Sequence, residues 1–187
     1  MTAAGLEVLL DEDGIDGTVN RLAGELSARF EDGVVLAAVL RGSVPFLSDL
    51  SRAMSIHSLI DFLAITKYER GTGRVRLLKD LDIDITNRDV VVVEDIVDTG
   101  LTSAFLRGEL SRRSPNSLGF CTLVDRSPAR VVPVQLDHVG IEIPDEFVIG
   151  YGLDYRGRYR NLKMLATVDT EVLASDPDAY VEDLYLS

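Results

Sequence analysis

The residues most able to do chemistry lie together between positions 90 and 102. Four consecutive valines predict a buried strand, and three acids, Glu94, Asp95 and Asp98, follow them closely. Carboxylates at the end of a strand can bind sugar hydroxyls or exchange a proton with a base. They repel phosphate, so any phosphate-binding groups must come from the turn that follows.

The turn after Asp98 opens the next predicted helix. The N–H groups at a helix start, together with the hydroxyls of Thr99 and Thr102, form a cradle for a phosphate. Gly100 allows close backbone approach, and Leu101 acts there through its backbone. The pattern predicts a site for a ribose phosphate; the alternative is that Asp98 and Thr99 only cap the helix and that the acids are solvated.

The acidic composition restricts the classes of partner. The 187 residues include 19 Lys and Arg against 31 Asp and Glu, a formal net charge of −12. Such a surface repels nucleic acid and anionic membranes, so an anionic substrate must be bound by local N–H groups, a metal ion or a few Arg. Charges interrupt every apolar stretch before the ~18 residues that a membrane helix needs. With no secretory signal, one Cys and two His, we expect a soluble cytoplasmic protein without a disulfide or a zinc cage.

Alternating strand and helix patterns predict the fold that positions these residues. The order implies parallel pairing with right-handed crossovers, and hence an α/β fold with an open, mainly parallel twisted sheet and helices on both faces. Ligands of such sheets bind at the carboxyl ends of the strands. Ser43 is the expected cap of the second helix. The predicted helices span 15–30, 43–53 and 102–113, and the predicted strands span 34–40, 59–66, 81–85, 90–95, 118–124, 139–143, 147–151 and 164–168.

Residues 90–102 resemble the ribose-phosphate signature of the type I phosphoribosyltransferases. Residues 40–43 resemble their pyrophosphate-contacting loop, and residues 75–82 resemble the segment after their mobile loop. Residues 143–155, with Arg160-Asn161-Leu162 after them, are similar to the base-binding region of the hypoxanthine-guanine phosphoribosyltransferases in particular. The resemblance covers most of the chain and separates this branch from the adenine, orotate and uracil branches.

The resemblance implies a reaction and an organisation. In purine salvage, 5-phosphoribosyl pyrophosphate and a 6-oxopurine, hypoxanthine and/or guanine, give the nucleoside monophosphate and pyrophosphate with Mg²⁺ as cofactor. One phosphoribosyltransferase domain would span residues 1–187, with a mobile loop at about 67–76, a small hood over the base site mainly at 126–168 and an acidic tail at 176–187. The tail itself predicts a surface segment or a short docking helix. Relatives are dimers or tetramers, so the resemblance implies a homodimer or homotetramer acting on small molecules, with neither nucleic acid nor membrane as partner.

The resemblance also implies roles for the acids and the turn. Glu94 and Asp95 would bind the ribose hydroxyls, and Asp98, near N7 of the purine, would be the general acid/base. The 5-phosphate would be held by Asp98, Thr99, Gly100, Leu101 and Thr102.

Three further segments supply the remaining implied contacts. Arg41, Gly42 and Arg160 would hold the pyrophosphate. Phe147 would stack on the base, and the Val148 backbone would read its edge. The implied base-binding set is Arg126, Phe147, Val148 and Asp154, and the implied metal-binding set is Asp154, Glu94 and Asp95.

Two departures from the family pattern bear on function. Arg126 stands where the family commonly has a Lys that reaches the 6-oxo group, and a planar fork is not an ammonium. Arg126 can still donate to the 6-oxo oxygen, so 6-oxopurine binding survives while the preference among bases moves; the alternative is that Arg126 is a surface cation and the 6-oxo contact is made otherwise. Lys67-Tyr68 stands where the family has Ser-Tyr, and the loop at 69–74 is short, which predicts a slower or less shielded enzyme. Two other functions stay open: a relative that favours xanthine or a modified oxopurine, and a non-catalytic RNA-binding regulator, against which the acid excess argues.

Overall fold

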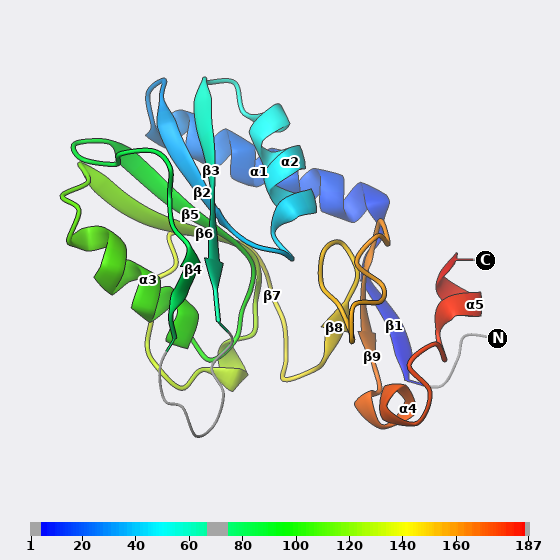
Figure 1. Cartoon of the computed structure of the whole chain (residues 1–187). Helices are drawn as coiled ribbons and strands as arrows, with labels where there is room; N and C mark the ends of the chain where they lie inside the picture. The colour runs from blue at the N-terminus through cyan, green and yellow to red at the C-terminus, as the bar shows by residue number, and fades with distance from the viewer. Residues whose placement is uncertain (1–4, 67–74, 186–187) are drawn as a thin grey trace.

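The computed structural model describes residues 5–66 and 75–185, so Lys67 and Tyr68, which the resemblance places in a loop, lie outside the described residues. A six-stranded sheet forms the larger layer, with helices on both faces (Figure 1). Across the sheet the strands are β4 (Leu77–Lys79), β3 (Ser58–Ile65), β2 (Val34–Val39), β5 (Asp89–Val97), β6 (Ser117–Asp125) and β7 (His138–Glu142). All neighbouring pairs are parallel except β3 and β4, which confirms the predicted mainly parallel α/β sheet.

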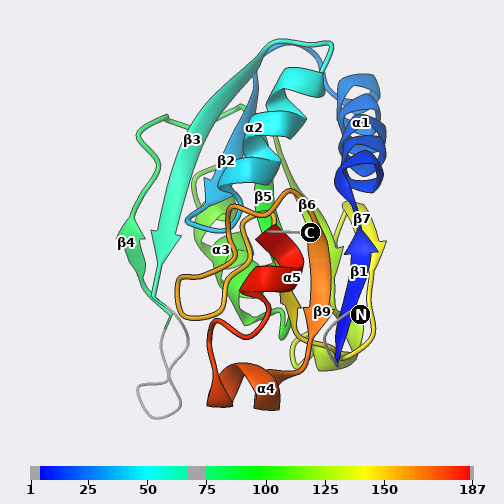
Figure 2. The same cartoon turned by 90° about the vertical axis from the view of Figure 1, so that its right-hand side faces the viewer.

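Successive valines of β5 point to opposite faces of this sheet, and their contacts show which helices cover each face. Val91 and Val93 belong to the core cluster that includes α1 (Glu12–Arg29) and α2 (Val44–Ala53). Val90 and Val92 pack instead with α3 (Leu101–Ser111) on the other face. Both faces of β5 are therefore buried, which explains a continuous run of valines. Figures 1 and 2 show α1 and α2 together on one side of the sheet.

A three-stranded antiparallel sheet beside the larger one forms the hood. Its strands, in order, are β1 (Leu6–Leu10), β9 (Leu165–Val168) and β8 (Val148–Ile149), and two short helices, α4 (Thr170–Ser175) and α5 (Val181–Tyr185), follow β9. Leu6 pairs with Val168, so the first and the last strand of the described chain lie side by side in this sheet (Figure 2). Tyr180 and Leu184 are buried in the hood core, so the acidic tail carries the short docked helix that was one of the two expectations.

The boundaries of the hood differ from the expected 126–168. His138–Glu142 forms β7 and pairs with β6, so this part of the expected hood belongs to the larger sheet. The hood gains β1, which no sequence pattern indicated, because its partner β9 lies at the other end of the chain. Among residues 5–66 and 75–185, no helix combines the length and the apolar character needed to cross a bilayer.

The strand predicted at 81–85 is wrong. Ile83 and Ile85 do turn inward, against the α3 face of the larger sheet. However, the backbone N–H groups of Asp82 and Ile83 donate to Asp61 Oδ2, at 2.7 and 2.8 Å, rather than to a strand. The alternation of apolar residues therefore predicted the buried side chains correctly. The backbone there does not pair with a neighbouring strand, because the Asp61 carboxylate accepts its N–H groups.

Replacing Asp61 by Asn is expected to lower the free energy of unfolding by roughly 1–3 kcal/mol near neutral pH. Asp61 is 5% exposed, and it also accepts the Phe62 N–H at 2.7 Å and lies 3.5 Å from Lys79 Nζ. Burial alone raises the pKa of Asp61, but the backbone hydrogen bonds and the Lys79 charge outweigh it and hold the pKa below its ordinary value of 3.8.

The sign of this shift fixes how the effect depends on pH. Because the folded pKa of Asp61 is depressed, its stabilisation is complete above 3.8 and is lost as the pH falls through the folded pKa. Urea unfolding of the wild-type chain and the Asp61→Asn variant, measured from neutral to strongly acidic pH, should show their difference shrinking at the acidic end. A difference that stays constant over the whole range contradicts this role of Asp61.

Candidate active site

One pocket of about 520 Å³ lies where the carboxyl ends of β2, β3, β5 and β6 face the hood. This is the edge at which parallel α/β sheets bind ligands. Its lining residues are Val39, Leu40, Arg41, Gly42, Ile65, Glu94, Asp95, Ile96, Asp98, Thr102, Arg126, Phe147, Val148, Leu153, Asp154 and Arg160. Of the site residues predicted within the described chain, only Thr99, Gly100 and Leu101 do not line it.

Glu94 and Asp95 bring two desolvated carboxylates to the end of β5. Glu94 is 4% exposed, and its Oε1 accepts a hydrogen bond of 2.7 Å from the Ser103 hydroxyl. Burial raises the pKa of Glu94 to about 7 and that of Asp95 to about 6. Carboxylates that have lost water favour ligands that return hydrogen-bond donors or positive charge, such as sugar hydroxyls or a cation.

Asp98 lies on the same edge and is paired with Arg126. Its Oδ1 is 2.7 Å from Arg126 Nε, while Arg126 Nη1 donates to the Glu146 carbonyl at 2.8 Å. Within the described chain, neither Asp98 Oδ1 nor Arg126 Nε has an aligned hydrogen-bond partner, so charge holds this contact. The Arg126 side chain is 18% exposed and lines the pocket, which favours a role in the site over that of a surface cation. Arg126 connects the acid at the end of β5 with the hood.

The turn between Asp98 and Thr102 presents backbone rather than side chains. Gly100 is the N-cap of α3 with φ 80°, and a Cβ at this position would lie 2.4 Å from the Val132 carbonyl oxygen. The Thr99 hydroxyl accepts the Leu101 N–H at 3.4 Å and does not reach the pocket. The groups left to face a ligand are the N–H groups at the start of α3 and the Thr102 side chain.

The loop after β2 lies against both Asp95 and the hood. A Cβ at Gly42 would lie 1.6 Å from Asp95 Oδ2, and a Cβ at Gly152 would lie 1.9 Å from the Gly42 carbonyl oxygen. The peptide between Leu40 and Arg41 is cis, and the Arg41 side chain is exposed. Glycine at 42 is therefore required by a close approach between three segments.

Ser43 is the N-cap residue of α2, as the sequence predicts, but its side chain does not cap the helix. Its hydroxyl donates to the Val39 carbonyl at 2.6 Å, and it makes no capping hydrogen bond. The side chain thus closes the β2 loop on itself instead of starting the helix.

Asp154 and Arg160 form a charged pair on the hood side of the pocket. Arg160 Nη2 lies 2.5 Å from Asp154 Oδ1, and Arg160 Nη1 donates to the Gly152 carbonyl at 2.5 Å. The other oxygen of Asp154 accepts the Gly157 N–H at 2.7 Å. The Asp154 carboxylate is thus held in place, and the guanidinium of Arg160 is presented to an anionic ligand.

Phe147 and Val148 supply the apolar wall of the pocket. The Phe147 ring packs edge-on against Tyr155 at a centroid distance of 6.0 Å, which fixes its orientation. Ile96 and Leu153 line the same pocket but were missed by sequence reasoning. Ile96 lies between Asp95 and Asp98 in the sequence, so its place in the pocket could have been predicted. For Leu153 the only indication is that it belongs to the segment that resembles the base-binding region.

The predicted metal set does not gather as one protein site. Among the residues that the structure describes, no group of three or more His, Cys, Asp or Glu side chains could hold a metal ion. Glu94 is engaged by Ser103, and Asp154 by Arg160. Mg²⁺ nevertheless commonly binds through one or two carboxylates plus substrate phosphates, and the donor set fits an ion of that kind.

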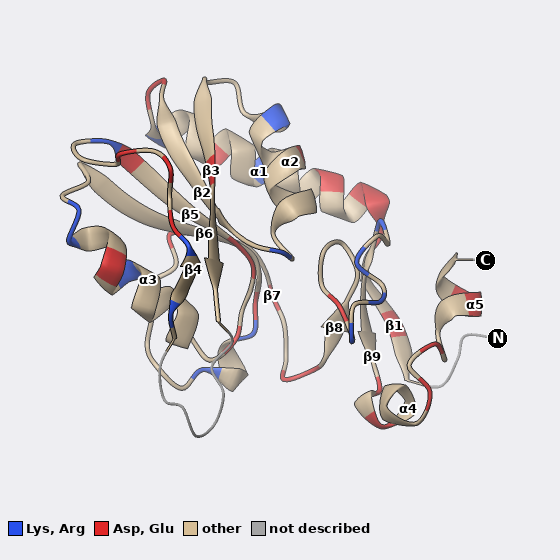
Figure 3. Ribbon diagram, in the orientation of Figure 1, with Lys and Arg blue, Asp and Glu red and all other residues tan. Residues whose placement is uncertain are grey.

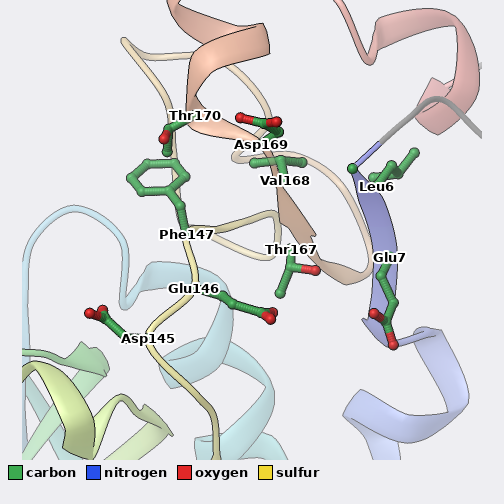
Figure 4. A pocket seen from close by; sticks show the side chains of 10 residues that line it. Leu6, Glu7, Asp145, Glu146, Phe147, Thr167, Val168, Asp169 and Thr170 are labelled. Atoms are coloured by element: carbon green, nitrogen blue, oxygen red, sulfur yellow. The ribbon is translucent and has the colours of Figure 1, made fainter.

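A second pocket, of about 480 Å³, lies against the hood sheet and shares Phe147 with the first (Figure 4). Glu7, Asp145, Glu146 and Asp169 line it, and its lining includes no Lys or Arg. Four carboxylates repel a phosphorylated ligand. The first pocket also holds four carboxylates, but three arginines, Arg41, Arg126 and Arg160, line it beside them, so of the two pockets its charge suits an anionic ligand better.

The sheet, the acids and glycine turn at the end of β5, and the hood beside them are those of an α/β protein with its pocket at the carboxyl edge of the strands. Residues 7–156 match the model of the phosphoribosyl transferase domain. The chain therefore belongs to the phosphoribosyltransferase family and is an enzyme, and this membership indicates a catalytic metal.

Characterised relatives and solved structures agree with this family. The chain is 46% identical over 151 residues to the hypoxanthine-guanine phosphoribosyltransferase of Mycobacterium tuberculosis, covering 79% of this chain and 75% of that one. It is 41% identical over 169 residues to the hypoxanthine phosphoribosyltransferase of Escherichia coli, covering 87% and 95%. The crystal structure of a Staphylococcus aureus hypoxanthine phosphoribosyltransferase matches with a TM-score of 0.85 at 40% identity, covering 89% of this chain and 92% of that one.

Proposed function

We propose that the protein transfers the phosphoribosyl group from 5-phosphoribosyl pyrophosphate to hypoxanthine or guanine, giving IMP or GMP and pyrophosphate, with Mg²⁺. One observation carries the proposal: a single pocket brings the acids of β5 together with Phe147 and Val148 of the hood. The names of the relatives, hypoxanthine and hypoxanthine-guanine phosphoribosyltransferase, support the same substrates.

The donor would bind along the strand edge. The N–H groups of the turn before α3, with Thr102, hold the 5-phosphate, and Glu94 and Asp95 take the ribose hydroxyls. Arg41, the Gly42 backbone and Arg160 hold the pyrophosphate. Of these residues, Arg41, Gly42, Glu94, Asp95, Thr102 and Arg160 line the pocket.

Magnesium would be held between the pyrophosphate oxygens and a carboxylate, with Asp154 on the hood side and Asp95 at the end of β5 as the candidates. When bound, Mg²⁺ acts as a Lewis acid that stabilises the charge on the departing pyrophosphate.

The purine would stack on Phe147, with the Val148 backbone at its N1 and C2 edge. Arg126 donates to the 6-oxo oxygen, and Asp98, beside it, takes the proton from N7 as N9 attacks the sugar. Substitution at the anomeric carbon passes through an oxocarbenium-like state, which the carboxylates near the ribose stabilise. The arginines stabilise the leaving group by charge-assisted hydrogen bonds.

Arg126 favours one alternative, a relative whose base preference has moved towards xanthine or a modified oxopurine. Its guanidinium is already committed to Asp98 and the Glu146 carbonyl, an arrangement that one ammonium would not reproduce. Xanthine is ranked lower, because its C2 oxygen requires a donor where the Val148 carbonyl would present an acceptor.

A panel of bases tests this proposal. With phosphoribosyl pyrophosphate and Mg²⁺, we expect turnover with hypoxanthine and guanine and little or none with adenine or uracil, because those bases lack the 6-oxopurine edge. Omitting Mg²⁺, with chelator present, should abolish turnover. Faster turnover of xanthine than of hypoxanthine would favour the alternative, and no turnover of any purine would overturn the proposal.

The organisation of the enzyme in the cell is part of the same proposal. We expect a cytoplasmic homodimer or homotetramer, in which the loop around Arg41 lies near a subunit interface. A non-catalytic RNA-binding role is disfavoured, because basic and acidic residues are interspersed along the chain and the net charge is −12 (Figure 3).

A further inference from the structure

A segment outside the pocket holds the backbone of the turn between β5 and α3 from behind. Arg130 Nε donates to the Asp98 carbonyl at 2.8 Å, and Arg130 Nη2 lies 3.4 Å from the Val97 carbonyl oxygen. The N–H groups of Val131 and Val132 both donate to the Thr99 carbonyl at 2.9 Å. Three consecutive carbonyl groups of the turn are therefore bonded to residues 130–132.

Because the peptide is planar, these hydrogen bonds also fix the direction of the N–H groups on the other side of each peptide. In a trans peptide, the carbonyl of one residue and the N–H of the next point in opposite directions. The carbonyls of Val97, Asp98 and Thr99 are fixed to residues 130–132. The N–H groups of the next residues, Asp98, Thr99 and Gly100, therefore point away from that segment. Within the described chain, no hydrogen bond takes the N–H of Thr99 or of Gly100.

Arg130 is itself held in place. Nη2 is paired with Asp125 Oδ1 at the end of β6, and the two side chains are 16% and 12% exposed. The stem of Arg130 packs on the turn as well, since a Cβ at Gly100 would lie 2.9 Å from Arg130 Cδ. A forked guanidinium can contact a carboxylate and two carbonyls at once, which an ammonium does less well.

We infer that Arg130, held by Asp125, is a positioning residue that preorganises the backbone N–H groups of the turn for the 5-phosphate of the substrate. The inference rests on the proposed function, since it assumes that this turn binds the phosphate. Arg130 does not touch the substrate; it acts through the peptide planes of residues 97–99. Its removal should therefore weaken the binding of a phosphorylated ligand and spare a ligand without the phosphate.

The test compares the affinities of IMP and inosine, measured by calorimetry, in wild-type and variant chains. The dissociation constant of inosine divided by that of IMP isolates the contribution of the phosphate. In Arg130→Met, which keeps the stem and removes the donors, we expect this ratio to fall roughly tenfold to a hundredfold, with inosine affinity unchanged. Arg130→Lys keeps the charge and the stem, and we expect a smaller fall in the same direction; it carries the test if the Met variant does not fold.

Arg113→Met is the matched control. Arg113 forms a two-point pair with Asp80, at 2.7 and 2.9 Å, and touches no part of the turn, so its loss should change stability and leave the ratio as in wild type. An unchanged ratio in folded Arg130 variants would overturn the role of Arg130 alone. Equal affinity of the wild-type chain for IMP and inosine would overturn the proposed phosphate site itself.

Discussion

An Asp98→Asn enzyme is expected to lose roughly 10²–10⁴-fold in kcat, while its KM for phosphoribosyl pyrophosphate changes little. The amide matches the carboxylate in size but neither accepts the N7 proton nor returns it. Asp98 lines the pocket, and its side chain is 38% exposed, so a ligand can reach it. The lost step is proton exchange with the base, which comes after donor binding.

Asp178→Asn is the control for loss of a carboxylate elsewhere. Asp178 pairs with Arg158, is 57% exposed and does not line the pocket, so its kcat should equal that of the wild type. Steady-state and single-turnover rates with hypoxanthine would be measured for both variants. An Asp98→Asn enzyme with full kcat would exclude Asp98 from the chemistry.

A Gly42→Ala enzyme is expected to lose about a hundredfold in kcat/KM for phosphoribosyl pyrophosphate, because displacements of about 1 Å at a reacting centre have effects of that size. The new methyl group would lie 1.6 Å from Asp95 Oδ2 and 2.6 Å from Asp95 Cγ. The severe clash is with the end of the Asp95 side chain, so we expect the carboxylate to move, whereas the Gly152 carbonyl oxygen, 3.3 Å from the new Cβ, has to shift only slightly. The loss should therefore appear in donor use, while the unfolding midpoint stays close to the wild-type value.

Gly24→Ala is the matched control for this substitution. Gly24 lies in α1, and a Cβ there meets nothing within 4 Å. Alanine in a helix interior is favoured over glycine by roughly 0.5–1 kcal/mol, so this variant should be slightly more stable and fully active. A Gly42→Ala chain with wild-type kcat/KM would show that use of the donor does not depend on the position of the Asp95 carboxylate.

The centre of the larger sheet could be predicted because its strands β2, β5 and β6 are buried on both faces. The valines of β5 leave little room for another interpretation, and parallel strands between helices fix the edge at which a ligand binds. The acids after these valines therefore had to lie at that edge. The resemblance supplied the hood residues, and the structure brings Phe147 and Asp154 to the same pocket as Glu94.

What the sequence pattern missed depends on contacts between distant residues. β1 (Leu-Glu-Val-Leu-Leu) has no regular alternation, and its partner β9 is the last strand of the described chain. The segment 81–85 has the alternation of a strand, but Asp61 takes its N–H groups. Arg130 lies in a polar loop with no pattern of its own, and only the fold reveals that it reaches the carbonyls of Val97 and Asp98.

The pairing of β1 with β9 has a consequence for synthesis on the ribosome. The elements of the larger sheet, with α1, α2 and α3, are all complete once residue 142 has been translated. β1 emerges first of all, yet it must wait for β9 at residues 165–168 before it has a neighbour in its sheet. The nascent chain therefore completes the sheet that carries Glu94, Asp95 and Asp98 before the hood that carries Phe147, Asp154 and Arg160.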